Sequence, residues 1–131
     1  MENFYKGNLN EDREKSLGHE GEEWLIGDFQ KFSDDDLRKT KLLELKYWKS
    51  REGAGHPTKI QKSAGEITII KRGWIKGFIG EKDITLTEGD YVYIPPSVVN
   101  NLVIEKSDDA EVLTIKSPSD KSDIIKILRI K

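Results

Sequence analysis

From residue 41 onward the chain repeats one pattern, short runs rich in β-branched and aromatic residues separated by turn residues. The runs lie at 41–48, 66–70, 73–79, 84–87, 91–94, 98–104 and 110–115. Turn signals such as Glu88-Gly89-Asp90 and Pro95-Pro96 divide them at intervals of about eight to twelve residues. Strands of this length and spacing are typical of all-β sandwiches and barrels, so the sequence predicts an all-β fold.

The two ends of the chain depart from this pattern. Residues 1–22 are polar and charged, and we expect an extended arm or loop there, followed by one β-barrel domain over 23–131. The acidic run at 33–37 is expected to form a polar connection between strands. The tail at 123–131 is ambiguous between helix and strand, and its isoleucines favour a strand.

Composition and charge narrow the classes of partner. The 22 basic and 24 acidic residues give a net charge of -2, with no bias toward nucleic acid or anionic membranes. The absence of cysteine excludes disulfides and thiolate metal ligands. No signal peptide or membrane-length apolar run is evident, so we expect a cytoplasmic protein with a small-molecule partner.

The best-defined motif lies around the run at 91–94. Gly89 is followed after five residues by Pro95, and Asn100 stands five positions after that proline. This spacing resembles the second signature motif of the cupins, in which a metal-binding histidine takes the last place. Here Ser97 takes the place of the motif's second glycine and Asn100 that of the histidine. The resemblance implies a cupin-type double-stranded β-helix, which is a jelly-roll barrel.

A weaker match to the first cupin motif precedes it. Glu66 and Gly73 have the spacing of that motif's glutamate and final glycine. A histidine pair, two residues apart, should stand three or four residues before the glutamate. Those two places hold Ile60 and Lys62 in one alignment, or Lys59 and Gln61 in the other.

The resemblance implies that the usual cupin metal site is incomplete. Such a site combines imidazole nitrogens with one carboxylate, and of these only Glu66 is present. With Lys62 and Asn100 in histidine places, a protonated lysine would repel a cation, and an amide is a poor ligand for a transition metal. We therefore predict a metal-independent protein without a cofactor.

The barrel register that the motifs imply predicts a ligand site. Lys62, Glu66 and Asn100 would form its polar end, with Asn100, Leu102 and Ile104 alternating inward. Its aromatic lining is expected from Trp48, Trp74 and Tyr93. Two simpler interpretations stay open: Lys62 and Glu66 form a structural ion pair, or Asn100 only satisfies backbone groups at the turn after Pro95-Pro96.

Three functions are compatible with these residues. The first is binding of a small polar or sugar-like ligand inside the barrel. The second is isomerisation or epimerisation of a nucleotide-linked sugar, with His56 as the base and Lys62 or Tyr93 assisting, because metal-free cupins of similar sequence use a histidine pair this way. The third is a structural or regulatory homodimer with a filled barrel. In every case we expect a homodimer paired through the segment around Trp24-Leu25-Ile26.

Overall fold

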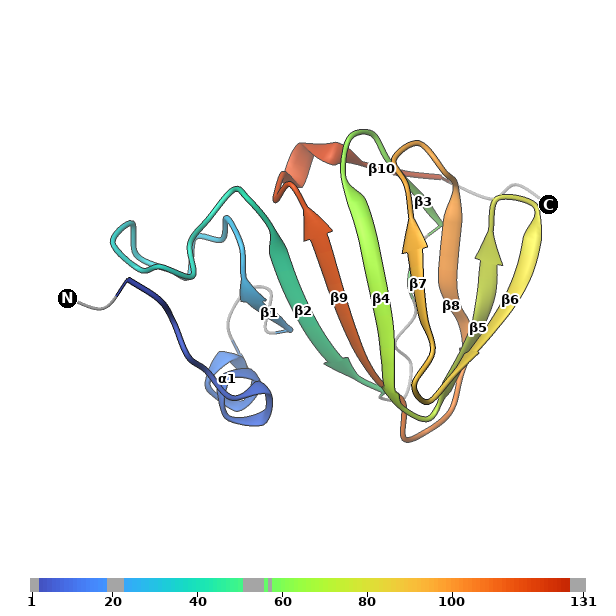
Figure 1. Cartoon of the computed structure of the whole chain (residues 1–131), viewed down its shortest axis with the longest axis horizontal. Helices are drawn as coiled ribbons and strands as arrows, with labels where there is room; N and C mark the ends of the chain where they lie inside the picture. Colours follow the sequence, from blue (N-terminus) through green and yellow to red (C-terminus); the bar gives the residue numbers. More distant parts are fainter. Residues whose placement is uncertain (1–2, 19–22, 51–55, 57, 128–131) are drawn as a thin grey trace.

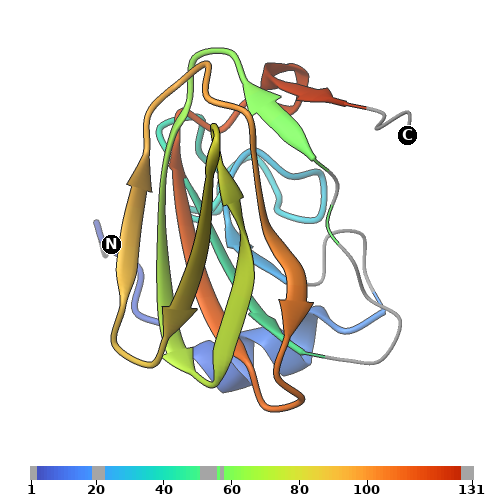
Figure 2. The same cartoon turned by 90° about the vertical axis from the view of Figure 1, so that its right-hand side faces the viewer.

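The computed structural model describes residues 3–18, 23–50, 56 and 58–127, which form two five-stranded antiparallel sheets (Figure 1). The first sheet has the order β1 (Trp24–Ile26), β2 (Glu44–Lys49), β9 (Glu111–Ser117), β4 (Gly65–Arg72), β7 (Tyr91–Ile94). The second has the order β10 (Ile124–Lys126), β3 (Lys59–Gln61), β8 (Asn100–Lys106), β5 (Trp74–Ile79), β6 (Lys82–Thr87). The sheets stack face to face (Figure 2), and the predicted all-β class is confirmed.

The hydrophobic core lies between the two sheets. Along β4 and β9 alternate residues are buried, as expected when one face of a strand meets an apolar interior. The innermost side chains are Ile70, Ile75, Ile94 and Val112, none more than 1% exposed. Trp48 closes this cluster. Burial of these side chains is what holds the two sheets together.

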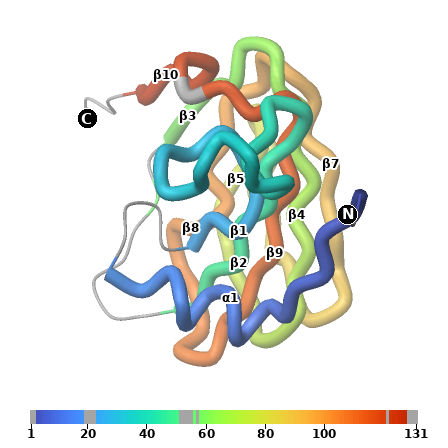
Figure 3. Tube along the Cα trace, turned by 90° about the vertical axis from the view of Figure 1, so that its left-hand side faces the viewer, coloured from blue at the N-terminus to red at the C-terminus, as the bar shows by residue number. Residues whose placement is uncertain are grey.

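The N-terminal arm differs from its prediction. Instead of an extended segment, residues Leu9–Ser16 form the helix α1, which lies beside β1 and β2 (Figure 3). Asn8 caps it, because its side chain accepts a hydrogen bond of 3.0 Å from the Glu11 amide. The Tyr47 hydroxyl donates to Asn10 over 3.3 Å and joins the arm to β2. The expectation of an extended arm is therefore wrong over these residues.

An irregularity in β8 changes which of its residues face inward. Between its regular pairs with β5, three residues of β8, 102–104, stand opposite Gly77 alone. A Cβ atom at Gly77 would lie 1.9 Å from the Asn101 carbonyl oxygen, so only glycine allows this approach. The bulge breaks the strand's alternation, and Ile104 is 55% exposed. The prediction that Ile104 points inward is wrong.

The remaining connections agree with the sequence where they are described. Residues 33–37 form turns between strands, and the predicted strand in the tail is present as β10, which pairs with β3. The Asp123 carboxylate accepts hydrogen bonds from the amides of Ser63 and Ala64, which secures the tail to the β3–β4 turn. The turn predicted over 53–57 lies outside the described residues except for His56. No helix in the described ranges is long and apolar enough to cross a membrane.

Candidate functional site

The inner faces of β2, β9 and β4 change from apolar to polar along their length. Paired residues of the three strands form three rows across the sheet. These rows are Trp48 with Val112 and Ile70, then Lys46 with Thr114 and Thr68, then Glu44 with Lys116 and Glu66. Since every second residue of a strand faces the same side, one register gathers the polar groups of all three strands at the end opposite the core.

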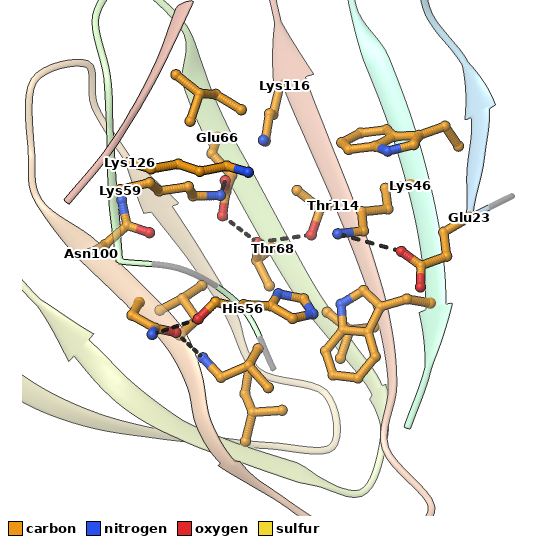
Figure 4. A pocket seen from close by; sticks show the side chains of 18 residues that line it. Glu23, Lys46, His56, Lys59, Glu66, Thr68, Asn100, Thr114, Lys116 and Lys126 are labelled. Atoms are coloured by element: carbon orange, nitrogen blue, oxygen red, sulfur yellow. Dashed lines mark hydrogen bonds and ion pairs between the residues drawn. The ribbon is translucent and has the colours of Figure 1, made fainter. Parts of the chain in front are cut away.

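This polar end opens into a cavity of about 570 Å³ between the two sheets (Figure 4). The second sheet and the loop before β3 supply its other walls. Its polar and charged lining comes from Glu23, Lys46, His56, Lys59, Glu66, Thr68, Asn100, Thr114, Lys116 and Lys126. A cavity of this size, with an apolar floor and convergent polar groups, suits a small organic molecule.

Glu66 is the most fully engaged group of the cavity. Its Oε1 accepts hydrogen bonds from Lys59 Nζ at 3.1 Å and Gln61 Nε2 at 3.3 Å, and its Oε2 accepts one from Thr68 Oγ1 at 2.8 Å. The side chain is only 3% exposed. Burial alone would raise the pKa of Glu66, but the ammonium groups of Lys59 and Lys116 and these hydrogen bonds hold it below its usual value. Glu66 is therefore an ionised, paired carboxylate.

Asn100 contributes a buried acceptor on the opposite sheet. Its Nδ2 donates to the Val98 carbonyl over 3.1 Å, whereas its Oδ1 is buried without a hydrogen-bond partner among the described residues. The residue pairs with Lys59 between β8 and β3. Gln61 Oε1 is likewise buried without a hydrogen-bond partner among the described residues. Buried acceptors of this kind are costly unless something donates to them, and Asn100, which lines the cavity, therefore has capacity for a ligand hydroxyl.

Two lysines lie at the other side of the cavity, near Trp24. Lys46 Nζ is 3.6 Å from a Glu23 carboxylate oxygen and 5.2 Å from the centre of the Trp24 ring, and Lys116 Nζ is 5.3 Å from the same centre. Lys116 is 6% exposed. Burial, with the neighbouring charge of Lys59 next, lowers the pKa of Lys116 to about 8. Burial likewise lowers the pKa of Lys46.

His56 enters the cavity from the loop before β3. Its ring centre is 5.0 Å from that of Trp48, at a tilt of 56°. Its backbone carbonyl accepts a hydrogen bond of 2.9 Å from Asn101 Nδ2, which holds His56 against β8. Burial, followed by the charges of Lys46 and Lys59, lowers the pKa of His56 to about 3. The imidazole is therefore neutral at physiological pH.

Four of the residues predicted from sequence meet in this cavity. Glu66, Asn100, Trp48 and His56 all line it, from four different segments of the chain. Their roles in ligand binding or proton transfer stay predictions.

Lys62 does not reach the cavity. Its side chain is exposed, while Lys59 and Gln61 on β3 point inward and contact Glu66. The alignment that placed Lys62 inside is thus wrong by one residue, and the alternative with Lys59 and Gln61 is correct. An ion pair with Glu66 does exist, but Lys59 makes it.

Trp74 and Tyr93 also lie away from the cavity. Tyr93 is 59% exposed because its neighbour Ile94 is fully buried, and adjacent residues of a strand face opposite sides. Trp74 precedes the buried Ile75 in the same way and packs on the outer face, with Lys76 Nζ 5.3 Å from its ring centre. The prediction that both rings line the cavity is wrong.

Sequence reasoning missed the lysines at 46 and 116. Lys46 stands two residues before Trp48, so strand alternation already placed it on the face predicted to line the barrel. Lys116 continues the alternation of Val112 and Thr114. Charged residues on a strand usually indicate a solvated face, which is why the pattern alone did not select them.

Comparison with known proteins bears on the fold. No family model matches the chain, and no curated protein matches its sequence. Solved structures do match. The TDP-quinovose 3,4-ketoisomerase WlaRB from Campylobacter jejuni superposes with a TM-score of 0.58 at 16% identity, over 68% of this chain and 73% of that one. An RmlC-like cupin with a double-stranded β-helix fold from Methanocaldococcus jannaschii gives a TM-score of 0.54 at 23% identity, over 63% of this chain and 76% of that one.

The chain has the cupin fold. KdgF from a Halomonas species is a further match, with a TM-score of 0.51 at 21% identity over 63% of this chain and 74% of that one. The double-stranded β-helix predicted from the two motifs is confirmed.

The residues at the metal-ligand places of this cupin fold do not fit a metal ion. These places hold Lys59, Gln61, Glu66 and Asn100. The carboxylate is already bound to the Lys59 ammonium, which has no lone pair to offer a cation. Within the part of the chain that the structure describes, no three histidine, cysteine, aspartate or glutamate side chains gather at one point. The polar groups that the described lining offers are amines, carboxylates, amides, hydroxyls and one imidazole.

Proposed function

We propose that this chain is a metal-independent cupin that binds a small, sugar-like molecule in the cavity between its two sheets. The observation that carries the proposal is the pairing of Lys59 with Glu66 at 3.1 Å inside a cavity that stays open. The pair neutralises the carboxylate that would otherwise attract a metal, and it leaves the surrounding space free for an organic ligand.

The polar groups around that space support a hydroxylated ligand. The acceptor Asn100 Oδ1 has no donor among the described residues, and the hydroxyls of Thr68 and Thr114, which lie 3.2 Å apart, line the same cavity. Trp48 provides an apolar surface at the floor. Proteins commonly bind a sugar ring by forming hydrogen bonds with its hydroxyl groups and by packing an aromatic ring against its apolar face. Two matching structures are 3,4-ketoisomerases, one of them a TDP-quinovose 3,4-ketoisomerase, which agrees with this class of ligand.

A thermal-shift screen with monosaccharides, uronic acids, sugar phosphates and sugar nucleotides tests the proposal. A ligand that binds only the folded state raises the melting temperature, by an amount that grows with its concentration over Kd. We expect Asn100→Leu, which removes the unpaired acceptor at similar volume, to abolish the shift. Tyr93→Leu on the outer face is the matched control and should retain it. A stoichiometric transition metal in elemental analysis of the purified protein would contradict metal independence.

Isomerisation of a nucleotide-linked sugar is the second candidate, because His56 enters the cavity as a neutral imidazole that can accept a proton. A base with a pKa of about 3 is weak, so this function requires a bound anion to raise it. Exchange of a sugar's α-proton with solvent deuterium, lost in His56→Ala, would be its signature. Absence of exchange with every bound sugar nucleotide would dismiss it.

The third function predicted from sequence, a barrel filled by its own side chains, conflicts with a cavity of about 570 Å³. The homodimer stays a prediction.

A further inference from the structure

The cavity holds more positive than negative charge. Its lining contains four lysines and two glutamates, which are Lys46, Lys59, Lys116, Lys126, Glu23 and Glu66. With His56 neutral, these groups sum to a charge of +2 at pH 7. The whole chain carries -2, so the excess of positive charge is local to the cavity. A concave site of one sign attracts ligands of the other.

Lys116 is the buried lysine of the cavity without an ion pair among the described residues, since Lys126, which also has none, is exposed to solvent. Lys59 is paired with Glu66 and Lys46 with Glu23, whereas no described carboxylate lies within ion-pair distance of Lys116. Its cross-strand neighbours are Glu44 and Glu66. Glu66 is engaged as described above, and Glu44 accepts a hydrogen bond of 2.9 Å from Ser119.

Burying a lysine that forms no ion pair is unfavourable, and the more distant charges of Glu66 and Glu44 offset this cost only in part. Structural lysines avoid this by reaching solvent or a carboxylate. In Figure 4 the Lys116 side chain points into the cavity, with its nitrogen joined to no other group. Among the described residues none supplies an ion pair, and the side chain points to where a ligand in the cavity would supply one.

Resting on the proposed function, we infer that the cavity's ligand is an anionic sugar, whose carboxylate or phosphate binds between Lys116 and Lys46 beside Trp24. Both ammonium groups lie within about 5.3 Å of the centre of that one indole ring, so a ligand that binds beside the ring approaches both. The hydroxyls of the sugar then extend toward Thr114, Thr68 and the acceptor of Asn100 on the far wall (Figure 4).

The ionisation of the cavity agrees with this assignment. The pKa of Lys116 is lowered by burial and by Lys59 and Lys46, and is raised by Glu66 and Glu44. A bound anion adds a further raising effect and returns Lys116 toward its ordinary pKa. Binding measured near pH 8.5 should therefore take up protons from the buffer, whereas binding at pH 6 should not.

Isothermal titration of the full chain at low ionic strength tests the inference with three probes: glucuronate, glucose 6-phosphate and glucose. At least one anion should bind ten-fold or more tightly than glucose, since charge-assisted hydrogen bonds are stronger than those between neutral groups. The comparison of the first two probes distinguishes a carboxylate from a phosphate. Lys116→Met should weaken the preferred anion by about ten-fold or more and leave glucose unchanged. Lys62→Met removes the same charge from an exposed position and should change neither.

Each outcome decides between the two claims. If glucose binds as tightly as both anions, or if Lys116→Met and Lys62→Met behave alike, the anionic ligand is refuted while sugar binding stands. If no sugar, neutral or charged, binds or raises the melting temperature, the proposed function falls and the inference with it. Lys46→Met serves as a second cavity variant if Lys116→Met does not fold.

Discussion

Replacing Lys116 with methionine should stabilise the ligand-free protein at neutral pH. The two side chains have similar length, and methionine fills the same space without a charge. Loss of a buried lysine usually destabilises when it breaks an ion pair. Here the ammonium has no paired carboxylate among the described residues and lies over the Trp24 ring, so the substitution removes a net cost.

The magnitude follows from the pKa of Lys116, about 8 in the folded protein against a reference of 10.5. Since each pKa unit corresponds to about 1.4 kcal/mol, the charged form is disfavoured on folding by about 3 kcal/mol. The unfolded chain binds more protons than the folded one between pH 8 and 10.5. The stability of the wild-type protein therefore rises with pH across that window, and the cost shrinks to about 1 kcal/mol at pH 10.

Urea denaturation of ligand-free protein at pH 7 and pH 10 measures this. Lys116→Met should be more stable than wild type by about 2–3 kcal/mol at pH 7 and by about 1 kcal/mol at pH 10. Lys59→Met is the matched contrast: it removes the partner of the buried Glu66, and we expect a loss of about 3 kcal/mol at pH 7. Equal destabilisation by both variants would refute the argument that Lys116 lacks a partner.

Three further predictions concern the fold around the cavity, the ionisation of His56 and the oligomeric state. Gly77→Ala should destabilise the fold by about 2 kcal/mol or more in denaturation, because its Cβ would meet the Asn101 carbonyl oxygen at 1.9 Å. The chemical shifts of the His56 ring should not titrate between pH 5 and 8 in ligand-free protein, since its pKa is about 3; a midpoint near 6.5 would show the ring to be solvated. Light scattering at micromolar concentration should give a dimer, and a monomer would contradict the predicted pairing through the segment around Trp24-Leu25-Ile26.

The fold was readable because its evidence is local. Alternation in 91–94 and 110–115 and the turn at Glu88-Gly89-Asp90 each depend on neighbouring residues. The helix α1 had a local signal as well, since Asn8 stands three residues before Glu11, and it was overlooked among the surrounding charges.

The site was only partly readable because it depends on register. The two alignments, one with Lys62 facing inward and the other with Lys59, differ by a shift of one residue. The strand β3 has only three residues, which is too short for alternation to choose between them. Glu66 and Asn100 were found because the motif spacing marks them. The sequence of β8 alone does not predict the bulge at 102–104, because the bulge depends on the close approach of β8 to Gly77 on the neighbouring strand β5.

The sequence by itself determined the all-β class, every strand except β1 and β3, and the absence of histidine from the motif places, because each depends on residue type and spacing along the chain. Only the tertiary structure decided that Lys46 and Lys116 share a cavity with Glu66. These residues are 20 to 70 positions apart, and they meet because β2, β9 and β4 pair in one register. The charge of the cavity is a sum over strands that the chain brings together only when it folds.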